Sequence, residues 1–222
     1  MYELYVYIGS CHAWLENGGI PKSEDYIIQE CGRGLIKLRR DTALGLLLFE
    51  APPLLRSGSL DPVELNIIMN GLGIQKDDIV ASAWCDNGVP WRGILMKSAS
   101  EVLKLTPNAS LLGDIDVGVI GRIDDMNINA DYEVRAFCPM DSPFEDPVTG
   151  SLNAGLAHWL IGEGLIDIIP STTDQSHGYI VRQGSAINRH GIVNIKSINN
   201  EIWVGGVCKT CIDGLVSFDH DV

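Results

Sequence analysis

The sequence predicts an α+β fold, in which mostly antiparallel strands are combined with a few helices. Short runs rich in Ile, Leu and Val recur along the 222 residues, and turn sequences such as "CGRG" and "RDTA" separate them. Fewer stretches carry helix signals. The best of these, at 151–163, has an apolar stripe at helical spacing, made of Leu152, Leu156, Trp159 and Leu160. We therefore expect a curved sheet wrapped around a central helix.

The first elements expected are a short helix at 9–17 and a three-stranded β-meander. Gly18-Gly19 follows the helix and can end it, since glycine takes up the left-handed conformation common after a helix. The sequence "APP" at 51–53 should stop the meander. Its strands are expected at 25–31, 34–40 and 44–50.

A helix near residue 61 is expected from its capping residues. Asp61 can cap its first turn, and Glu64 three residues later completes a capping box. Pro62 suits the first helical position, because its missing N–H has no partner there. Gly71 or Gly73 should end this helix.

The remaining elements are mostly strands. Ser98 and Glu101 form a second capping box, so another helix should follow Ser98. A hairpin turn is expected at Asn199-Asn200, because asparagine tolerates left-handed backbone angles. The strands of this part are expected at 78–85, 91–97, 117–123, 132–138, 178–183, 191–198, 201–207 and 214–218.

The charge balance excludes some classes of partner. The chain has 16 Lys and Arg against 29 Asp and Glu, which gives a formal net charge of −13. Nucleic-acid binding needs clustered cations, so we expect no nucleic-acid partner. No stretch is long and apolar enough to cross a membrane, and the first residues lack a signal-peptide pattern. A cytoplasmic protein without a membrane partner is therefore expected.

Neither the cysteines nor the histidines are spaced as a metal site. Most of the six cysteines lie in apolar runs, where cysteine acts as a small buried hydrophobe. Cys208 and Cys211 have redox spacing, but they lie between two expected strands, whereas a redox pair usually sits at a helix start. The five histidines lack the spacing of metal ligands, and His12 is interpreted as structural. We expect no metal and no cofactor.

The stretch "FEDPVTGS" at 144–151 is the strongest candidate for a functional site. Glu145 and Asp146 come directly before a tight turn and the predicted helix start. Such a start exposes backbone N–H groups that can bind an anion, such as a substrate carboxylate. Thr149 and Ser151 can cap or donate hydrogen bonds, and Gly150 leaves room for close approach. The same residue types are also common at helix starts that have only a structural role.

Several motifs resemble the phenazine-biosynthesis PhzF-like family, which has the diaminopimelate-epimerase fold. "EDPVTGS" after a strand ending "YEVRAFCP" is similar to a specific signature of that family. "AWCDNGVPWRGILM" resembles its Gly-Pro-Trp hairpin, and "RQGSAINRHG" resembles a further segment in which Asn188, His190 and Gly191 replace the usual Gly, Pro and Ser. "IWVGGVCKTCIDGLVSF" is similar to its closing hairpin. The resemblance runs from about Gly9 onward.

The resemblance implies two lobes, each a curved sheet around a central helix, with the active site between them. It places an incomplete first lobe at 1–54 together with a final strand at about 206–222, and a second lobe at 55–205. It implies proton transfer without metal or organic cofactor on a small carboxylic acid. Asp146 would be the catalytic acid of the second lobe, and Gly150 and Ser151 would bind the substrate.

The family's catalytic Glu and its Cys-Gly-His-Ala-Thr turn have no counterpart in this sequence. "MYELYVY" looks like an unrelated replacement, and apolar surface from Cys11, Trp14 and Leu15 should then be exposed, which favours a homodimer. Two interpretations stay open. The chain is an isomerase or epimerase, or it is an inactive homologue that binds an anionic metabolite or acts as a dimer module.

Further candidates for substrate binding lie outside the main motif. Asn87 and Trp91 belong to the hairpin that resembles the family's Gly-Pro-Trp segment. Gln183 and Arg189 lie in the family-like segment "RQGSAINRHG", and they can equally be ordinary polar residues at strand ends. Glu145 and Thr149 complete the predicted binding set.

Overall fold

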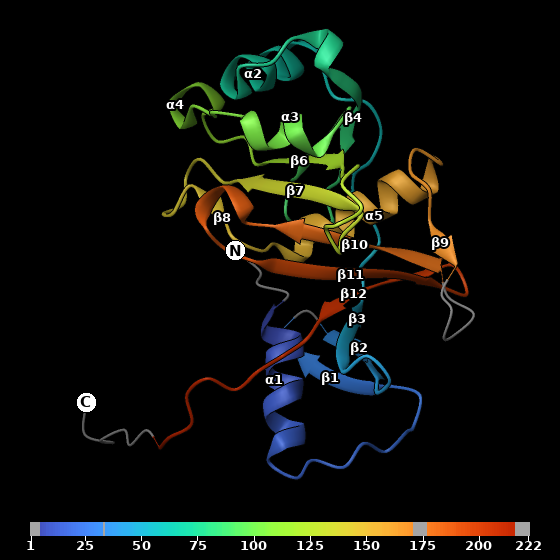
Figure 1. Ribbon diagram of the computed structural model, residues 1–222. Helices are drawn as coiled ribbons and strands as arrows, with labels where there is room; N and C mark the ends of the chain where they lie inside the picture. Colours follow the sequence, from blue (N-terminus) through green and yellow to red (C-terminus); the bar gives the residue numbers. More distant parts are fainter. Residues whose placement is uncertain (1–4, 33, 171–176, 216–222) are drawn as a thin grey trace, which may run out of the picture.

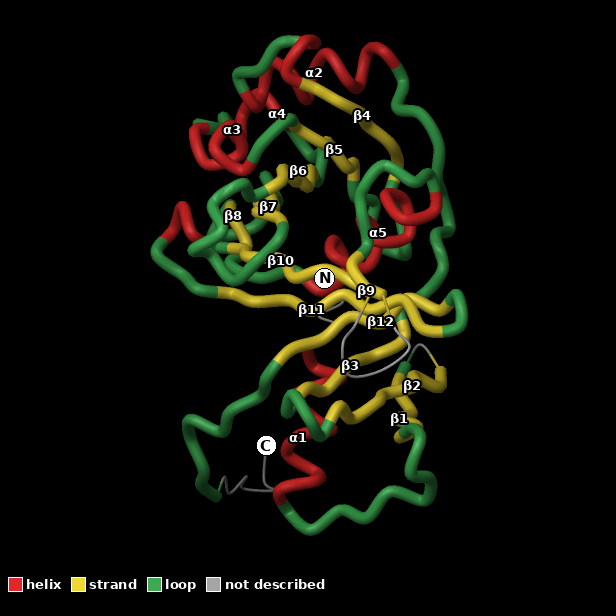
Figure 2. Tube along the Cα trace, turned by 45° about the vertical axis from the view of Figure 1, so that its right-hand side comes forward, coloured by secondary structure: helices red, strands yellow, loops and turns green. Residues whose placement is uncertain are grey.

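The computed structural model describes residues 5–32, 34–170 and 177–215. In this part, twelve strands form one continuous sheet in the order β1-β2-β3-β12-β11-β10-β7-β6-β5-β4, with β8 beside β7 and β9 beside β10. Neighbouring strands are antiparallel except for the pairs β10–β7 and β5–β6. Figures 1 and 2 show two lobes, with α1 and β1–β3 in the smaller one.

The smaller lobe contains the predicted β-meander and its helix. Its strands are β1 (Ile27–Cys31), β2 (Gly34–Asp41) and β3 (Leu46–Glu50). Its helix α1 spans Tyr5–Glu16, so it begins four residues before the predicted 9–17. Tyr7 and Cys11, one helical turn apart, are buried, and the Tyr7 ring meets Phe49 edge-on at 6.4 Å. These contacts extend the helix, and they correct the expectation that Cys11 is exposed. Trp14 is exposed, as predicted.

The larger lobe holds the remaining strands, whose neighbouring residues face opposite sides of the sheet. Ala83, Leu95 and Ile120 face one core, whereas Trp84 and Ile94 face another. The strands are β4 (Ile79–Trp84), β5 (Arg92–Met96), β6 (Val117–Arg122), β7 (Tyr132–Phe137), β8 (Glu145–Asp146), β9 (Ile169–Pro170), β10 (His177–Gln183), β11 (Gly191–Ile198) and β12 (Glu201–Gly206). Both faces of the β4–β7 part of the sheet are therefore covered.

One helix fills the inside of this curved sheet, and three cover its outside. The inner helix, α5, spans Gly150–Gly162, and ten of its 13 residues are buried. The helix α5 is thus buried on nearly all sides, whereas the predicted apolar stripe would bury only one face. The outer helices are α2 (Pro62–Leu72), α3 (Ala99–Lys104) and α4 (Ala109–Leu112), and Figure 1 shows them together at one end of the molecule. Short 3₁₀ turns span Lys76–Asp78 and Ser185–Ile187.

Glycines allow α5 to lie directly against the sheet. A Cβ added to Gly118 would lie 2.1 Å from a methyl carbon of Leu152, and one added to Gly155 would lie 2.5 Å from the carbonyl oxygen of Cys85. A Cβ on Gly93 would come within 2.8 Å of the Trp159 ring. Because these glycines have no side chain, α5 packs closely against β5, β6 and the end of the β4 segment.

The capping residues were predicted correctly, and their partners were predicted only in part. Asp61 accepts a hydrogen bond from the N–H of Val63, and Gly73 ends the helix in the left-handed conformation. The carboxylate of Glu64 accepts from Arg92 of β5 at 2.7 and 2.8 Å, in place of the predicted capping box. Both side chains are partly buried, so this tertiary ion pair is partly shielded from water.

The end of the chain departs from the prediction. Asn199 and Asn200 form the predicted hairpin turn with φ values of 53° and 67°. β12 then pairs with β3 of the smaller lobe, which joins the two lobes in one sheet. Residues 207–215 form no strand, contrary to the strands predicted at 206–222 and 214–218, whose remaining residues 216–222 lie outside the described part. Within the described residues, no helix is long and apolar enough to cross a membrane.

Candidate functional site

The start of α5 lies where the two lobes meet. β8 ends at Asp146, and α5 begins at Gly150 after a short turn. Two cavities open beside this turn, and Phe49 of β3 lines both of them. The first turn of α1 contributes Tyr7 to one cavity and Ile8 to the other. The sequence motif that was predicted to be functional is thus placed between the lobes.

A network of hydrogen bonds fixes the turn that carries Asp146. The Thr149 hydroxyl donates to Oδ2 of Asp146 at 2.7 Å. The Gln183 side chain, fully buried, donates to the Asp146 carbonyl and to the Thr149 hydroxyl, and its oxygen accepts from the Thr149 N–H. Asn153 donates to the Thr149 carbonyl and to the oxygen of Gln183. Thr149 thus holds the carboxylate of Asp146 in one orientation, and Gln183 holds Thr149 and the backbone of Asp146. That both residues also bind substrate stays a prediction.

A second set of contacts fixes Ser151. The indole Nε1 of Trp91 donates to Oγ of Ser151 at 3.0 Å, and the amide of Asn87 donates to the Ser151 carbonyl at 2.8 Å. Trp91 is buried and lines neither cavity, so its part in the site is to position Ser151. Asn87 and Ser151 both line the first cavity. The sequence placed these three residues in the site, and the structure joins them through hydrogen bonds.

Glu145 forms a buried ion pair. Its two carboxylate oxygens accept from Nε and Nη2 of Arg135 at 3.0 and 2.7 Å, and both side chains are buried. Arg135 also donates to the carbonyls of Val102 and Leu105 at the end of α3, where helix carbonyls lack the usual intrahelical partners. This bidentate pair ties β7, β8 and α3 together. Glu145 therefore has a structural role, and its part in substrate binding stays a prediction.

The first turn of α5 presents donors without protein partners. In an α-helix the first N–H groups have no intrahelical acceptor. Among the described residues, no group accepts from the backbone N–H of Gly150 or of Ser151. Gly150 lines the second cavity and Ser151 the first, so the helix start lies between the two. The positive end of the helix dipole adds to the attraction for an anion at this place.

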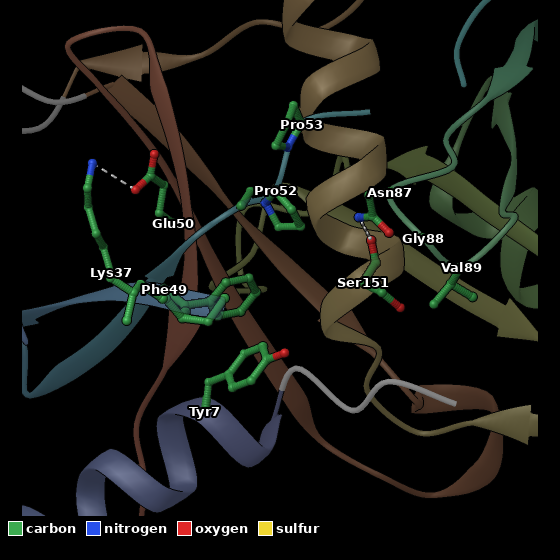
Figure 3. A pocket seen from close by; sticks show the side chains of 13 residues that line it. Tyr7, Lys37, Phe49, Glu50, Pro52, Pro53, Asn87, Gly88, Val89 and Ser151 are labelled. Carbon is green, nitrogen blue, oxygen red and sulfur yellow. Dashed lines mark hydrogen bonds and ion pairs between the residues drawn. The ribbon is translucent and has the colours of Figure 1, made fainter. Parts of the chain in front are cut away.

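The first cavity has a volume of about 310 Å³ and mostly apolar walls. Figure 3 shows Tyr7 and Phe49 on one side of it and Asn87 and Ser151 on the other. An ion pair between Lys37 and Glu50, with 3.0 Å between nitrogen and oxygen, belongs to the same lining. The other lining residues are Leu35, Ile36, Ala51, Pro52, Pro53, Gly88 and Val89.

The second cavity is larger, at about 530 Å³, and contains Asp146. Asp146 and Gly150, at the two ends of the turn before α5, meet His190 of a distant segment here. The remaining lining consists of glycines and apolar residues: Ile8, Phe49, Pro147, Val148, Gly191, Ile192, Val193, Val204, Gly205, Gly206 and Val207.

Arg189 does not join the other predicted residues. Its side chain is exposed, lines neither cavity, and donates to the carbonyl of Asn188 at 3.3 Å. Its neighbour His190 lines the second cavity instead, although sequence reasoning gave it no role. Tyr7 and Phe49 were missed as well, because nothing in their local sequence shows that the lobes close over the α5 start. For His190 alone the sequence offered a signal, since a histidine replaces the usual proline of the family-like segment.

The cysteines near the site are unsuited to nucleophilic chemistry. Burial raises the pKa of the Cys138 thiol to about 12, and the carboxylates of Asp116, Asp141 and Asp146 add to the effect. Burial likewise raises the pKa of Cys85, beside α5, to about 12. A thiol is nucleophilic only as the thiolate, so both remain inert near neutral pH. Within the described residues, no group of three His, Cys, Asp or Glu side chains could hold a metal.

Comparisons with known proteins agree with this architecture. A family model described as phenazine biosynthesis-like protein matches residues 6–212. Antisense-enhancing sequence 1 of Schizosaccharomyces pombe is 29% identical over 228 residues, which cover 93% of this chain and 72% of that protein. An uncharacterized isomerase of the same yeast is 30% identical over 133 residues, covering 54% of this chain and 68% of that protein.

Solved structures show the same fold. A phenazine biosynthesis PhzC/PhzF protein from Clostridium difficile superposes with a TM-score of 0.67 at 19% identity, covering 98% of this chain and 74% of that one. A predicted epimerase from Pseudomonas aeruginosa gives a TM-score of 0.62 at 15% identity, covering 90% and 69%. The two-lobed diaminopimelate-epimerase-like fold predicted from sequence is thus confirmed. The chain belongs to the phenazine biosynthesis-like, or PhzF-like, family.

Proposed function

We propose that this protein is an isomerase or epimerase that moves a proton on a small carboxylic acid without a cofactor. One observation carries the proposal: the carboxylate of Asp146 opens into the same cavity as the free helix start at Gly150. Membership of the PhzF-like family supports it, as does similarity to proteins described as an isomerase and an epimerase.

The helix start provides the substrate-binding part of the proposed site. A substrate carboxylate placed there accepts from the N–H groups of Gly150 and Ser151, and the helix dipole favours its negative charge. The Ser151 hydroxyl accepts from Trp91, which leaves its own proton for an oxygen of the ligand. Binding and proton transfer are then a few residues apart on one rigid turn.

Asp146 provides the proton-transfer part. The Thr149 hydroxyl holds Oδ2 of Asp146, which leaves Oδ1 to exchange a proton with the substrate. A carboxylate held at a fixed place beside a bound substrate is a suitable general base or acid. Apolar residues such as Val193 and Val204 form the walls around it and limit the access of water.

Solvent deuterium exchange tests the proposed function. The protein is incubated in D₂O with a dihydro-hydroxyanthranilate and with a panel of amino and hydroxy acids, and mass spectrometry follows incorporation at carbon. We expect exchange with at least one compound and a loss of about 10²- to 10⁴-fold in Asp146→Asn, the usual effect of removing a general acid or base. Asp141→Asn, which changes an exposed carboxylate outside both cavities, is the matched control and should exchange at the rate of the unchanged protein.

Calorimetry with the same panel separates binding from chemistry. Gly150→Val should lower carboxylate affinity more than tenfold, because its side chain would occupy the place of the anion. Tight binding that depends on Gly150, together with no exchange for any compound, would show an inactive binding protein and would refute the isomerase proposal.

A further inference from the structure

The second cavity contains two titratable side chains from separate parts of the chain. Among the described residues that line it, Asp146 and His190 can gain or lose a proton, and all the others are glycines or apolar. Isomerisation by proton transfer needs one group that accepts a proton and one that donates. Asp146 is the first of these in the proposed function. We infer that His190 is the second, a catalytic residue that donates a proton to the substrate.

The backbone around His190 is packed directly on the turn that follows Asp146. A Cβ added to Gly191 would lie 2.1 Å from Cγ2 of Val148, so the backbone beside His190 lies directly against the turn between β8 and α5. Gly184 begins the same loop with a φ of +86°, and a Cβ there would lie 2.6 Å from the carbonyl oxygen of Pro147. The N–H of Arg189 donates to the carbonyl of Gly184 at 2.9 Å and closes the loop.

These contacts give His190 and Asp146 a common support. Pro147 and Val148 lie between Asp146 and the start of α5, and the loop that ends at His190 packs against the same two residues. A catalytic pair on one rigid support keeps its geometry while the substrate binds and leaves. The imidazole of His190 is itself exposed, so it can exchange its proton with solvent between turnovers.

The proposed step conserves every atom and rests on the proposed function. The Asp146 carboxylate takes a proton from a C–H of the substrate and becomes a carboxylic acid, while the electron pair of the broken bond enters the conjugated system of the substrate. The His190 imidazolium gives a proton to another atom of the substrate and becomes neutral imidazole. The product is an isomer of the substrate, and proton exchange with water restores both side chains.

The ligand class follows from the two groups together. A suitable substrate has a carboxylate for the α5 start and a carbon acid whose anion is stabilised by conjugation. Apolar walls formed by Ile192, Val193 and Val204 favour a compact, uncharged body beyond that carboxylate.

The test compares two histidine variants in the deuterium-exchange assay and in calorimetry. His190→Gln should slow exchange about 10²- to 10⁴-fold while carboxylate affinity changes less than threefold. His177→Gln replaces another exposed histidine, at the start of β10 and outside the cavity, and should exchange like the unchanged protein. Added imidazole should restore part of the lost rate in His190→Gln, because the missing side chain is reached from solvent.

Each outcome distinguishes this inference from the proposed function. Exchange that depends on Asp146 and is unchanged in His190→Gln would overturn the role of His190 and leave the isomerase proposal intact. A variant that loses affinity but keeps its rate at saturating substrate would also overturn it, since His190 would then be a binding residue. No exchange by the unchanged protein with any compound would overturn both.

Discussion

Replacing Glu145 by Gln should destabilise the protein strongly, even though Glu145 belongs to the most conspicuous motif of the sequence. The residue Glu145 is 7% exposed and its partner Arg135 is 5% exposed. The substitution removes the negative charge that compensates a buried guanidinium, and one of the two oxygens that accept from it. Breaking a buried ion pair on one side costs about 3–5 kcal/mol, because the remaining charge is left uncompensated.

Urea and thermal unfolding measure this effect. For a domain of this size about 1 kcal/mol corresponds to a shift of about 2–4 °C, so the melting temperature should fall by about 6–20 °C. The double variant Glu145→Leu with Arg135→Met is the matched control. It removes both charges and keeps a similar volume, so it should lose much less than Glu145→Gln alone.

The same experiment decides between a structural and a ligand-binding role for Glu145. A Glu145→Gln variant that unfolds within about 1 kcal/mol of the unchanged protein would refute the buried ion pair as a major contribution. A folded variant with normal stability and more than tenfold weaker carboxylate binding would show that Glu145 binds the substrate.

Three further predictions follow from the packing around α5. Gly155→Ala should lower the free energy of unfolding by about 1–3 kcal/mol in calorimetric unfolding, since the new methyl meets the backbone carbonyl of Cys85, just after β4. Gly162→Ala on the same helix is the control, because its new methyl enters open space and should leave the stability unchanged. Burial raises the pKa of Cys85 from 9.0 to about 12, so the unfolded chain loses the thiol proton at lower pH than the folded protein does. The free energy of unfolding should therefore fall as pH rises from 9 toward 12. Cys85→Ala should reduce this fall, which urea titrations at about pH 8 and 10 measure. Trp91→Phe removes the hydrogen bond to Ser151 and should weaken carboxylate binding about two- to tenfold in calorimetry, while unchanged affinity would show that Ser151 needs no support.

The sequence predicted well where the decisive interactions are local. Asp61 and Ser98 cap helices through N–H groups two or three residues away, and Asn199-Asn200 turns a hairpin through its own backbone angles. The start of α5 was likewise placed within one residue, since a turn followed by a run of apolar residues at helical spacing specifies it. In each case the partner lies within a few positions along the chain.

The predictions failed where a residue's partner is distant in sequence. Glu64 looked like half of a capping box, but Arg92 is a better partner, because both side chains are partly buried between α2 and β5. The pairing of β12 with β3 was not predicted, because it joins segments that are distant in sequence and no local pattern encodes that register. Strand order is set by the burial of whole faces of the sheet.

The sequence by itself determined the family, the class of fold and the position of the motif that contains Asp146 and Gly150. Only the tertiary structure decided what each polar residue of that region does. Folding buries Glu145 against Arg135 and brings the amide of Gln183 into hydrogen-bonding contact with the backbone of Asp146. It also places His190 in the lining of the cavity that contains Asp146. The physical reason is that a carboxylate, an amide or an imidazole has the same local sequence signal whether it pairs inside the protein or remains open to a ligand. Burial and partners alone separate these cases, and both arise when distant segments pack together.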